Sequence, residues 1–286
     1  MYQNYIFDLY GTLVDIRTDE ERAEVWEKLR LFYGYYGAVY EAGELRACYR
    51  KLVEDRIRGG AGGTGYAERG DGAFGGELVK DRDESGIDGK GYEACPEIKI
   101  EQVFSELFAL KGVRAGEELA VCAGQFFRVL STEHIGLYEG ARELLERLKE
   151  SGKRLYLLSN AQRIFTAYEM ELLKIAGYFD GIFLSSDFGI KKPERQFFER
   201  LILQYDLDVR ESIMIGNDEV CDIAGAKRAG LSTCYIHTGI SPEYTGMAEP
   251  TYRVMEPDFE KVYEMICGEG KQEGTKRGVL PEDNMG

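Results

Sequence analysis

The sequence predicts an α/β fold: a Rossmann-like, mostly parallel sheet flanked by helices, with an inserted α-helical cap domain. Two observations carry this prediction. Short apolar strands alternate with amphipathic helices between residues 153 and 266, an order typical of a parallel sheet covered on both faces. The first apolar strand, in YIFDLYGTLVD at residues 5–15, is separated from them by a long, mainly helical stretch. At 286 residues the chain is long enough to bury a substantial core.

The elements of the predicted core follow from period and punctuation. Five further strands are expected at 153–160, 181–186, 212–218, 232–238 and 251–255. Helices are expected before, between and after them at 137–152, 164–178, 193–206, 219–230 and 258–266. We therefore assign residues 1–15 and 135–268 to the α/β core, and residues 269–286 to a polar tail.

The cap is assigned to residues 16–134. Thr18 and Glu21 have the spacing of a capping box and predict a helix that starts there. Further helical patterns cover residues 41–57, 96–112 and 116–131. Residues 59–95 are rich in glycine and acidic side chains, a composition that buries little apolar surface, so we expect a flexible insertion.

Composition limits the function classes. The formal net charge of -15 argues against a nucleic-acid partner, because phosphate backbones bind basic surfaces. A small anionic substrate in a local basic pocket remains compatible with it. The six cysteines show neither zinc-ligand nor disulfide spacing, and no apolar run is long enough to span a membrane. We expect a soluble, cytoplasmic protein without a membrane partner; its oligomeric state is not indicated.

Polar side chains stand at the ends of four predicted strands. They are Asp8 after the first strand, Ser159 and Asn160 after the second, Lys191 and Lys192 after the third, and Asp218 and Asp222 after the fourth. In a parallel sheet the carboxyl ends of strands lie side by side, where ligands bind. Together these residues predict a catalytic site.

These segments resemble the four motifs of the haloacid dehalogenase-like hydrolase superfamily. DLYGTLVD is similar to its first motif, LYLLSN to its second, GIKKPERQFF to its third and IGNDEVCDIAGAKRAG to its fourth, in that order. The resemblance covers about residues 3–236. It implies a hydrolase with a nucleophilic aspartate at the first strand end.

The resemblance also implies a role for each residue. Asp8 would be the nucleophile that forms a covalent aspartyl intermediate. Thr12 and Ser159 would bind oxygens of the transferred group, with Asn160 beside them, and Lys192, which directly precedes Pro193, would balance the charge.

In phosphate-handling members of the superfamily a magnesium ion completes the site. The ligands implied here are the Asp8 carboxylate, the main-chain carbonyl of Tyr10, and Asp218, with Asp222 in support. Converging carboxylates repel unless a cation offsets them, and oxygen ligands suit Mg²⁺. Asn217 stands where many members have aspartate, so the shares of Asp218 and Asp222 stay open.

Tyr10 divides the possible reactions. Most phosphatases of the superfamily carry a second aspartate there as acid and base, and tyrosine is a poor substitute at neutral pH. The 2-haloacid dehalogenase branch has Asp-x-Tyr-Gly-Thr, as here, and a halide leaves without protonation. The acidic fourth motif favours a magnesium-dependent phosphatase of a small phosphorylated metabolite. A metal-free 2-haloacid dehalogenase and a non-catalytic small-ligand binding module remain the alternatives.

Overall fold

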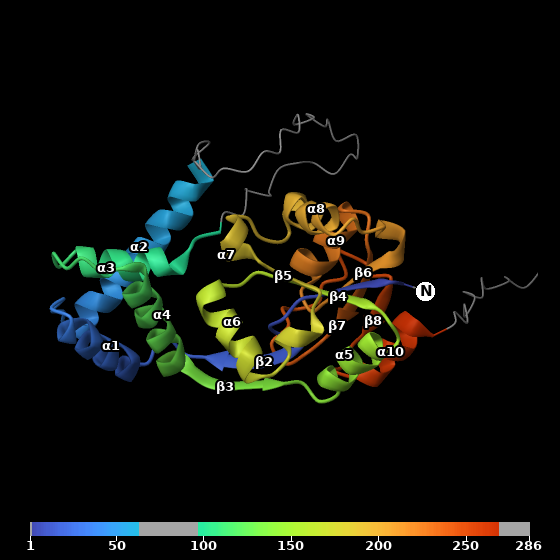
Figure 1. Cartoon of the computed structure of the whole chain (residues 1–286), viewed down its shortest axis with the longest axis horizontal. Coiled ribbons are helices and arrows are strands. Elements are labelled where there is room, and N and C mark those ends of the chain that lie inside the picture. The colour runs from blue at the N-terminus through green and yellow to red at the C-terminus, as the bar shows by residue number, and fades with distance from the viewer. Residues whose placement is uncertain (1, 63–96, 269–286) are drawn as a thin grey trace, which may run out of the picture.

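The computed structural model describes residues 2–62 and 97–268, which form a sheet-based core joined to a helical insertion (Figure 1). The glycine-rich segment expected at 59–95 lies outside the described residues from residue 63 onward, as does the tail at 269–286. Residues 59–62 are the end of helix α2. No described helix is both long and apolar enough to cross a membrane.

Six parallel strands form the main sheet, in the order β5-β4-β1-β6-β7-β8. They are β1 (Asn4–Phe7), β4 (Arg154–Ser159), β5 (Gly181–Leu184), β6 (Ser212–Gly216), β7 (Ser232–Ile236) and β8 (Tyr252–Val254). Each strand coincides with a segment that the sequence predicts, β1 starting one residue earlier, and the Rossmann-like parallel sheet is confirmed. Because β1 lies between β4 and β6, the chain order reverses beside it, which places a ligand crevice at its carboxyl end.

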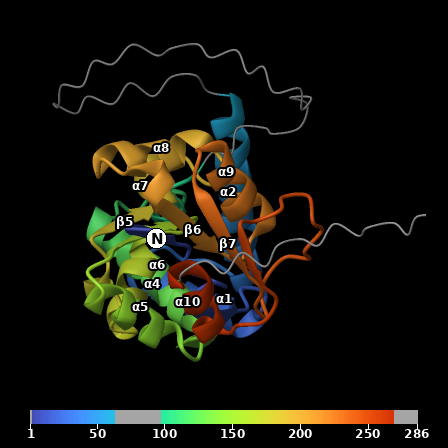
Figure 2. The same cartoon turned by 90° about the vertical axis from the view of Figure 1, so that its right-hand side faces the viewer.

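Side chains alternate between the two faces of the sheet, as strand geometry requires. On β1, Tyr5 and Phe7 pack on one face, whereas Ile6 packs on the other. Helices α5 (Ala141–Glu150), α6 (Arg163–Leu172) and α10 (Phe259–Cys267) contribute to the first apolar cluster, and α8 (Arg195–Gln204) and α9 (Gly225–Arg228) contribute to the second. Both faces are therefore covered, and α8 and α9 lie opposite α5 and α10 in the end-on view (Figure 2).

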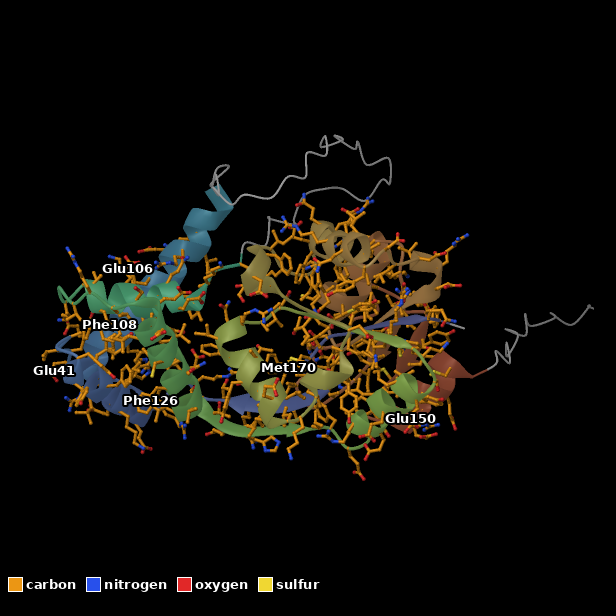
Figure 3. All side chains as sticks on the ribbon, viewed as in Figure 1. Glu41, Glu106, Phe108, Phe126, Glu150 and Met170 are labelled. Atoms are coloured by element: carbon orange, nitrogen blue, oxygen red, sulfur yellow. The ribbon has the colours of Figure 1, made fainter. Side chains whose placement is uncertain are left out.

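The helical insertion has an apolar core of its own. It comprises α1 (Ala23–Tyr35), α2 (Ala42–Gly62), α3 (Ile100–Ala109) and α4 (Glu117–Ser131), which pack around a cluster rich in aromatic side chains. The labelled Phe108 and Phe126 lie in this unit, whereas Met170 lies on α6, between the insertion and the sheet (Figure 3). Among the described core residues, Ile164 and Phe165 of α6 pack against the insertion's cluster.

A two-stranded antiparallel ribbon joins the two units. It is formed by β2 (Val14–Thr18) and β3 (Thr132–Leu137), which run along one edge of the molecule (Figure 1). The predicted domain boundaries, at residues 15/16 and 134/135, fall inside this ribbon.

The capping box expected at Thr18 and Glu21 is wrong. Thr18 ends β2, helix α1 begins only at Ala23, and no side chain caps its first turn. The physical reason is an alternative partner, because the Glu21 carboxylate pairs with Arg46 and Arg50 of α2.

Candidate active site

Three adjacent strand ends converge on the first candidate residue, Asp8. The residue directly follows β1, and Phe7 is in register with Leu157 of β4 and Ile215 of β6. Ser159, which ends β4, and Asn217, which follows β6, therefore stand at the same edge of the sheet as Asp8. This edge is the carboxyl end, where the sequence predicts the site.

The Asp8 carboxylate is buried and bound on both oxygens. Its Oδ1 accepts hydrogen bonds from Ser159 Oγ at 3.0 Å and Lys192 Nζ at 2.7 Å. Its Oδ2 accepts a hydrogen bond from Thr12 Oγ1 at 3.2 Å. The structure thus brings two hydroxyls and one ammonium group around one carboxylate, which is a set of donors able to hold the oxygens of an anionic substrate.

Lys192 lies between two carboxylates. Its Nζ is 2.7 Å from Asp8 Oδ1 and 2.7 Å from Asp222 Oδ1, and its side chain is 2% exposed. Burial opposes the charged form of Lys192, but the two carboxylates outweigh this and raise its pKa above the ordinary value. Burial also raises the pKa of Asp222, to about 7, against the opposing effect of the Lys192 ammonium group. One ammonium group thus faces two buried carboxyl groups, so a further positive charge bound at this site would be stabilised by them.

Asn160 fixes the main chain of Lys192. Its Nδ2 donates to the Lys192 carbonyl at 2.9 Å, and its Oδ1 accepts from the Lys192 amide at 2.7 Å. The amide side chain therefore holds the loop after β5 against the end of β4 and positions the ammonium group beside Asp8.

The fourth motif contributes through unequal contacts. Asp218 Oδ1 accepts from the amides of Val220 and Cys221, both at 2.8 Å, and caps the π-helical turn Glu219–Ala224. Asp222 Oδ2 accepts from the Asp218 amide at 3.0 Å while Oδ1 binds Lys192. Asn217 Oδ1 accepts from the same Thr12 hydroxyl that binds Asp8, at 3.2 Å. Asn217 and Asp222, rather than Asp218, are linked to Asp8 through shared hydrogen-bond partners.

The loop at residues 8–14 carries the nucleophile that the sequence predicts, and we call it the nucleophile loop. It makes a close approach to Asn217. Gly11 has φ +82°, and a Cβ there would lie 2.3 Å from Asn217 Nδ2. The Gly11 carbonyl accepts from Thr238 Oγ1 at 2.6 Å, which fastens the loop to the segment after β7. Only glycine fits this conformation and this contact together.

The Tyr10 side chain turns to helix α6. Its hydroxyl donates to Glu169 and lies 3.0 Å from Thr166 Oγ1. Burial, and then the nearby Glu169 carboxylate, raise the pKa of Tyr10 above its ordinary value. The phenol is therefore protonated at neutral pH, with its proton directed to Glu169.

A divalent cation at these strand ends would need oxygen ligands. No group of three or more His, Cys, Asp or Glu side chains within residues 2–62 and 97–268 could hold a metal ion. Mg²⁺ needs fewer, because it keeps several waters and takes one or two carboxylates with other oxygen ligands. Asp8 Oδ2 and Asn217 Oδ1 converge on one hydroxyl. This all-oxygen set suits Mg²⁺.

Two features of the site had no clear sequence signal. Asn217 could be noticed because it directly follows a strand, but its contact with Thr12 depends on the turn at Gly11. The contact of Glu169 with Tyr10 joins residues far apart in the chain and has no motif.

Comparison with known proteins gives a consistent picture. The family model of the haloacid dehalogenase-like hydrolases matches residues 2–230. A glyceraldehyde 3-phosphate phosphatase of Pyrococcus abyssi is 31% identical over 100 residues, which cover 35% of this chain and 42% of that protein. A phosphoserine phosphatase of Thermus thermophilus is 28% identical over 154 residues, 54% of this chain and 60% of that protein. The chain thus spans about half the length of these curated relatives.

Solved structures share the fold. A 2-haloacid dehalogenase from Pseudomonas syringae pv. Tomato superposes with a TM-score of 0.57 at 17% identity, covering 93% of this chain and 98% of that one. A dehalogenase crystallised with an intermediate gives a TM-score of 0.52 at 16% identity, with coverage of 92% and 96%. At these identities the likeness concerns architecture.

Proposed function

The chain belongs to the haloacid dehalogenase-like hydrolases, and we propose that it is a magnesium-dependent phosphatase of a small phosphorylated metabolite. The observation that carries the proposal is the buried Asp8 carboxylate, held by the hydroxyls of Ser159 and Thr12 and by the Lys192 ammonium group. The phosphatases among the curated relatives support this choice of reaction.

In the proposed reaction an Asp8 oxygen attacks the phosphorus atom. A P–O bond forms, the bond to the leaving oxygen breaks, and the leaving group departs with that electron pair. Ser159, Thr12 and Lys192 donate to the phosphoryl oxygens as charge develops on them. Water then cleaves the aspartyl phosphate, which restores Asp8 and releases inorganic phosphate.

The magnesium ion would be held by the Asp8 carboxylate, the Tyr10 main-chain carbonyl and an oxygen of the fourth motif. When bound, Mg²⁺ would offset the negative charge shared by substrate and carboxylates. The sequence proposes Asp218 or Asp222 as the fourth-motif ligand, and the contact through Thr12 adds Asn217 Oδ1 as a candidate. The small anionic substrate would bind at the same edge, with the helical insertion as a cap.

Tyr10 restricts the substrates of this phosphatase. Because its pKa is raised and its proton is directed to Glu169, Tyr10 is a poor acid for a departing alkoxide. We therefore expect good turnover of phosphates with weakly basic leaving groups, such as aryl or acyl phosphates. The same observation favours the second candidate, 2-haloacid dehalogenation, in which halide leaves without a proton.

A paired assay separates the two candidates. Purified protein is incubated with an aryl phosphate and with 2-chloropropionate, each with and without Mg²⁺. We expect phosphate release that requires Mg²⁺ and is abolished in Asp8→Asn. Halide release that is indifferent to a chelator would overturn the phosphatase, and turnover of neither substrate class, with Mg²⁺ still bound, would favour a non-catalytic binding module.

A further inference from the structure

Helix α6 packs against the helical insertion. It begins at Arg163, shortly after Ser159, so its position is tied to the candidate site. Just before it, Gln162 Oε1 accepts from the Ile100 amide at 3.0 Å, and Gln162 Nε2 donates to the Ile98 carbonyl at 2.9 Å. Both partners lie at the start of α3. The insertion is therefore hydrogen-bonded to Gln162, in the segment that follows the second motif.

A close approach of α4 and α6 forms the second part of this contact. A Cβ at Gly124 of α4 would lie 2.6 Å from Ile164 Cδ1 of α6. The Arg128 guanidinium lies 5.3 Å from the ring centroid of Phe165, in the range of a cation–π contact. The two helices therefore meet through a small residue and an arginine.

One turn further along α6, an ion pair joins both units to the nucleophile loop. Arg128 Nε donates to Glu169 Oε1 at 2.6 Å and Arg128 Nη2 to Glu169 Oε2 at 3.3 Å, a bidentate arrangement. The Glu169 carboxylate also accepts a hydrogen bond from the Tyr10 hydroxyl. Arg128 belongs to the insertion, Glu169 to α6, and Tyr10 to the loop that begins with Asp8.

Glu169 is buried and Arg128 is mostly covered, beside an opening between the two helices. The side chains of Arg128 and Glu169 are 17% and 6% exposed. Both line a cavity of about 550 Å³ between α4 and α6, whose other walls are mainly apolar. Beside this opening the ion pair adds directional bonds to the apolar contact between the two helices.

We propose that Arg128 and Glu169 are positioning residues, which make the conformation of the nucleophile loop depend on the docking of the helical insertion against α6. When the insertion is docked, Arg128 orients the Glu169 carboxylate, and the carboxylate fixes the Tyr10 ring. When the insertion moves away, Glu169 loses its counter-charge, and Tyr10 loses an oriented acceptor. The loop that carries Asp8 is then free to relax.

The test combines three variants with one matched control. Arg128→Met removes the ion pair, Arg128→Lys keeps the charge but not the bidentate geometry, and Tyr10→Phe removes only the hydroxyl. The control is Arg56→Met, which breaks the 2.6 Å ion pair with Glu106 between α2 and α3, inside the insertion. Hydrogen exchange of peptides covering residues 8–14 is measured for each protein, together with kcat and KM for an aryl phosphate.

The expected results follow from the order of contacts. Arg128→Met should speed exchange in residues 8–14 by about tenfold or more relative to the control. It should lower kcat by up to about 100-fold, because a misplacement of about 1 Å at a reacting group can cost that much. KM should change much less than kcat. The exchange rate and kcat of Arg128→Lys should lie between those of the parent protein and Arg128→Met. Combining Tyr10→Phe with Arg128→Met should change the exchange rate and kcat little beyond Arg128→Met alone, since both substitutions break the same series of contacts.

Two results would overturn the proposal. One is exchange in residues 8–14 that stays at the control value in both Arg128→Met and Tyr10→Phe. The other is full additivity of the effects of these two substitutions on the exchange rate of residues 8–14. Only the kinetic readout rests on the proposed phosphatase function, so a protein that turns over no phosphate still decides the proposal through hydrogen exchange.

Discussion

Replacing Lys192 with methionine should destabilise the fold strongly. Methionine is nearly isosteric with lysine but lacks its charge, so the substitution leaves two buried carboxyl groups without their cationic partner. Each 2.7 Å contact with Asp8 and Asp222 corresponds to a gross attraction of about 6 kcal/mol at an effective dielectric constant of about 20. Desolvation of the buried ammonium group and repulsion between the two acids cancel much of this gain. Removing one partner of a buried ion pair costs about 3–5 kcal/mol, and we expect Lys192→Met to lower the free energy of unfolding by this amount at pH 7.5.

The loss should depend on pH in a defined direction. The pKa of Asp222 is already raised to about 7 by burial, and it rises further without Lys192. A carboxyl whose pKa is raised in the folded state binds its proton more tightly when folded than when unfolded. The free energy of unfolding of Lys192→Met should therefore rise by about 1.4 kcal/mol for each unit that the pH falls from 7.5 towards 5.5, whereas protein that keeps Lys192 gains at this rate only below the Asp222 pKa of about 7.

The assay is urea denaturation followed by circular dichroism at both pH values, with EDTA present so that no divalent cation contributes. The control is Lys191→Met, which changes the same residue type at the neighbouring, half-buried position. A free energy of unfolding for Lys192→Met within about 1 kcal/mol of that control would refute the reasoning, given the loss of 3–5 kcal/mol expected for a broken buried pair. A free energy of unfolding for Lys192→Met that does not rise between pH 7.5 and pH 5.5 would refute the titration argument.

Three further outcomes are expected. Gly11→Ala should lower the melting temperature and the turnover together, because it strains a positive φ and places a Cβ 2.3 Å from Asn217 Nδ2; an unchanged melting curve would contradict this. Asp218→Ala should lower the free energy of unfolding by about 1 kcal/mol because the helix cap is lost, whereas Asp218→Asn should retain the cap and the stability. Denaturation midpoints of the two variants measure this difference. Burial raises the pKa of Tyr33, so above pH 10 the unfolded chain releases this proton first, and Tyr33 contributes a fall in the free energy of unfolding of about 1.4 kcal/mol per pH unit. Tyr33→Phe should make this fall less steep in urea melts between pH 9 and 11.

The core of the fold could be predicted because its signals are local. Apolar runs such as residues 212–216 are bounded by polar residues and alternate with helical patterns, and strand order places their ends together. The ribbon of β2 and β3 could not be predicted for the opposite reason, because its signals are not local. Each strand is short and partly exposed, and its pairing partner lies more than a hundred residues away, so neither half carries a pattern of its own.

The site was predictable where residue type and strand end coincide. Asp8, Ser159 and Lys192 meet within hydrogen-bond distance, which is the arrangement expected from their positions. For Asp218 the sequence leaves two uses open, since an aspartate after a strand can bind a ligand or cap a helix, and only its two main-chain contacts reveal the cap. Such contacts depend on the local turn rather than on residue type.

Tyr10 joins the catalytic and conformational arguments. A hydroxyl whose proton is directed to Glu169 is poorly placed to supply a proton to a leaving group, so the residue that weakens general acid catalysis also links the nucleophile loop to α6. These two consequences can be separated, because Tyr10→Phe breaks the link without adding an acid, whereas Tyr10→Asp adds an acid without reaching as far as the phenol. If Tyr10→Asp raises turnover of alkyl phosphates while hydrogen exchange of residues 8–14 increases, then acid supply and loop positioning are independent demands on one position. A fall in turnover with increased exchange would mean that loop order limits the reaction more than the missing acid does.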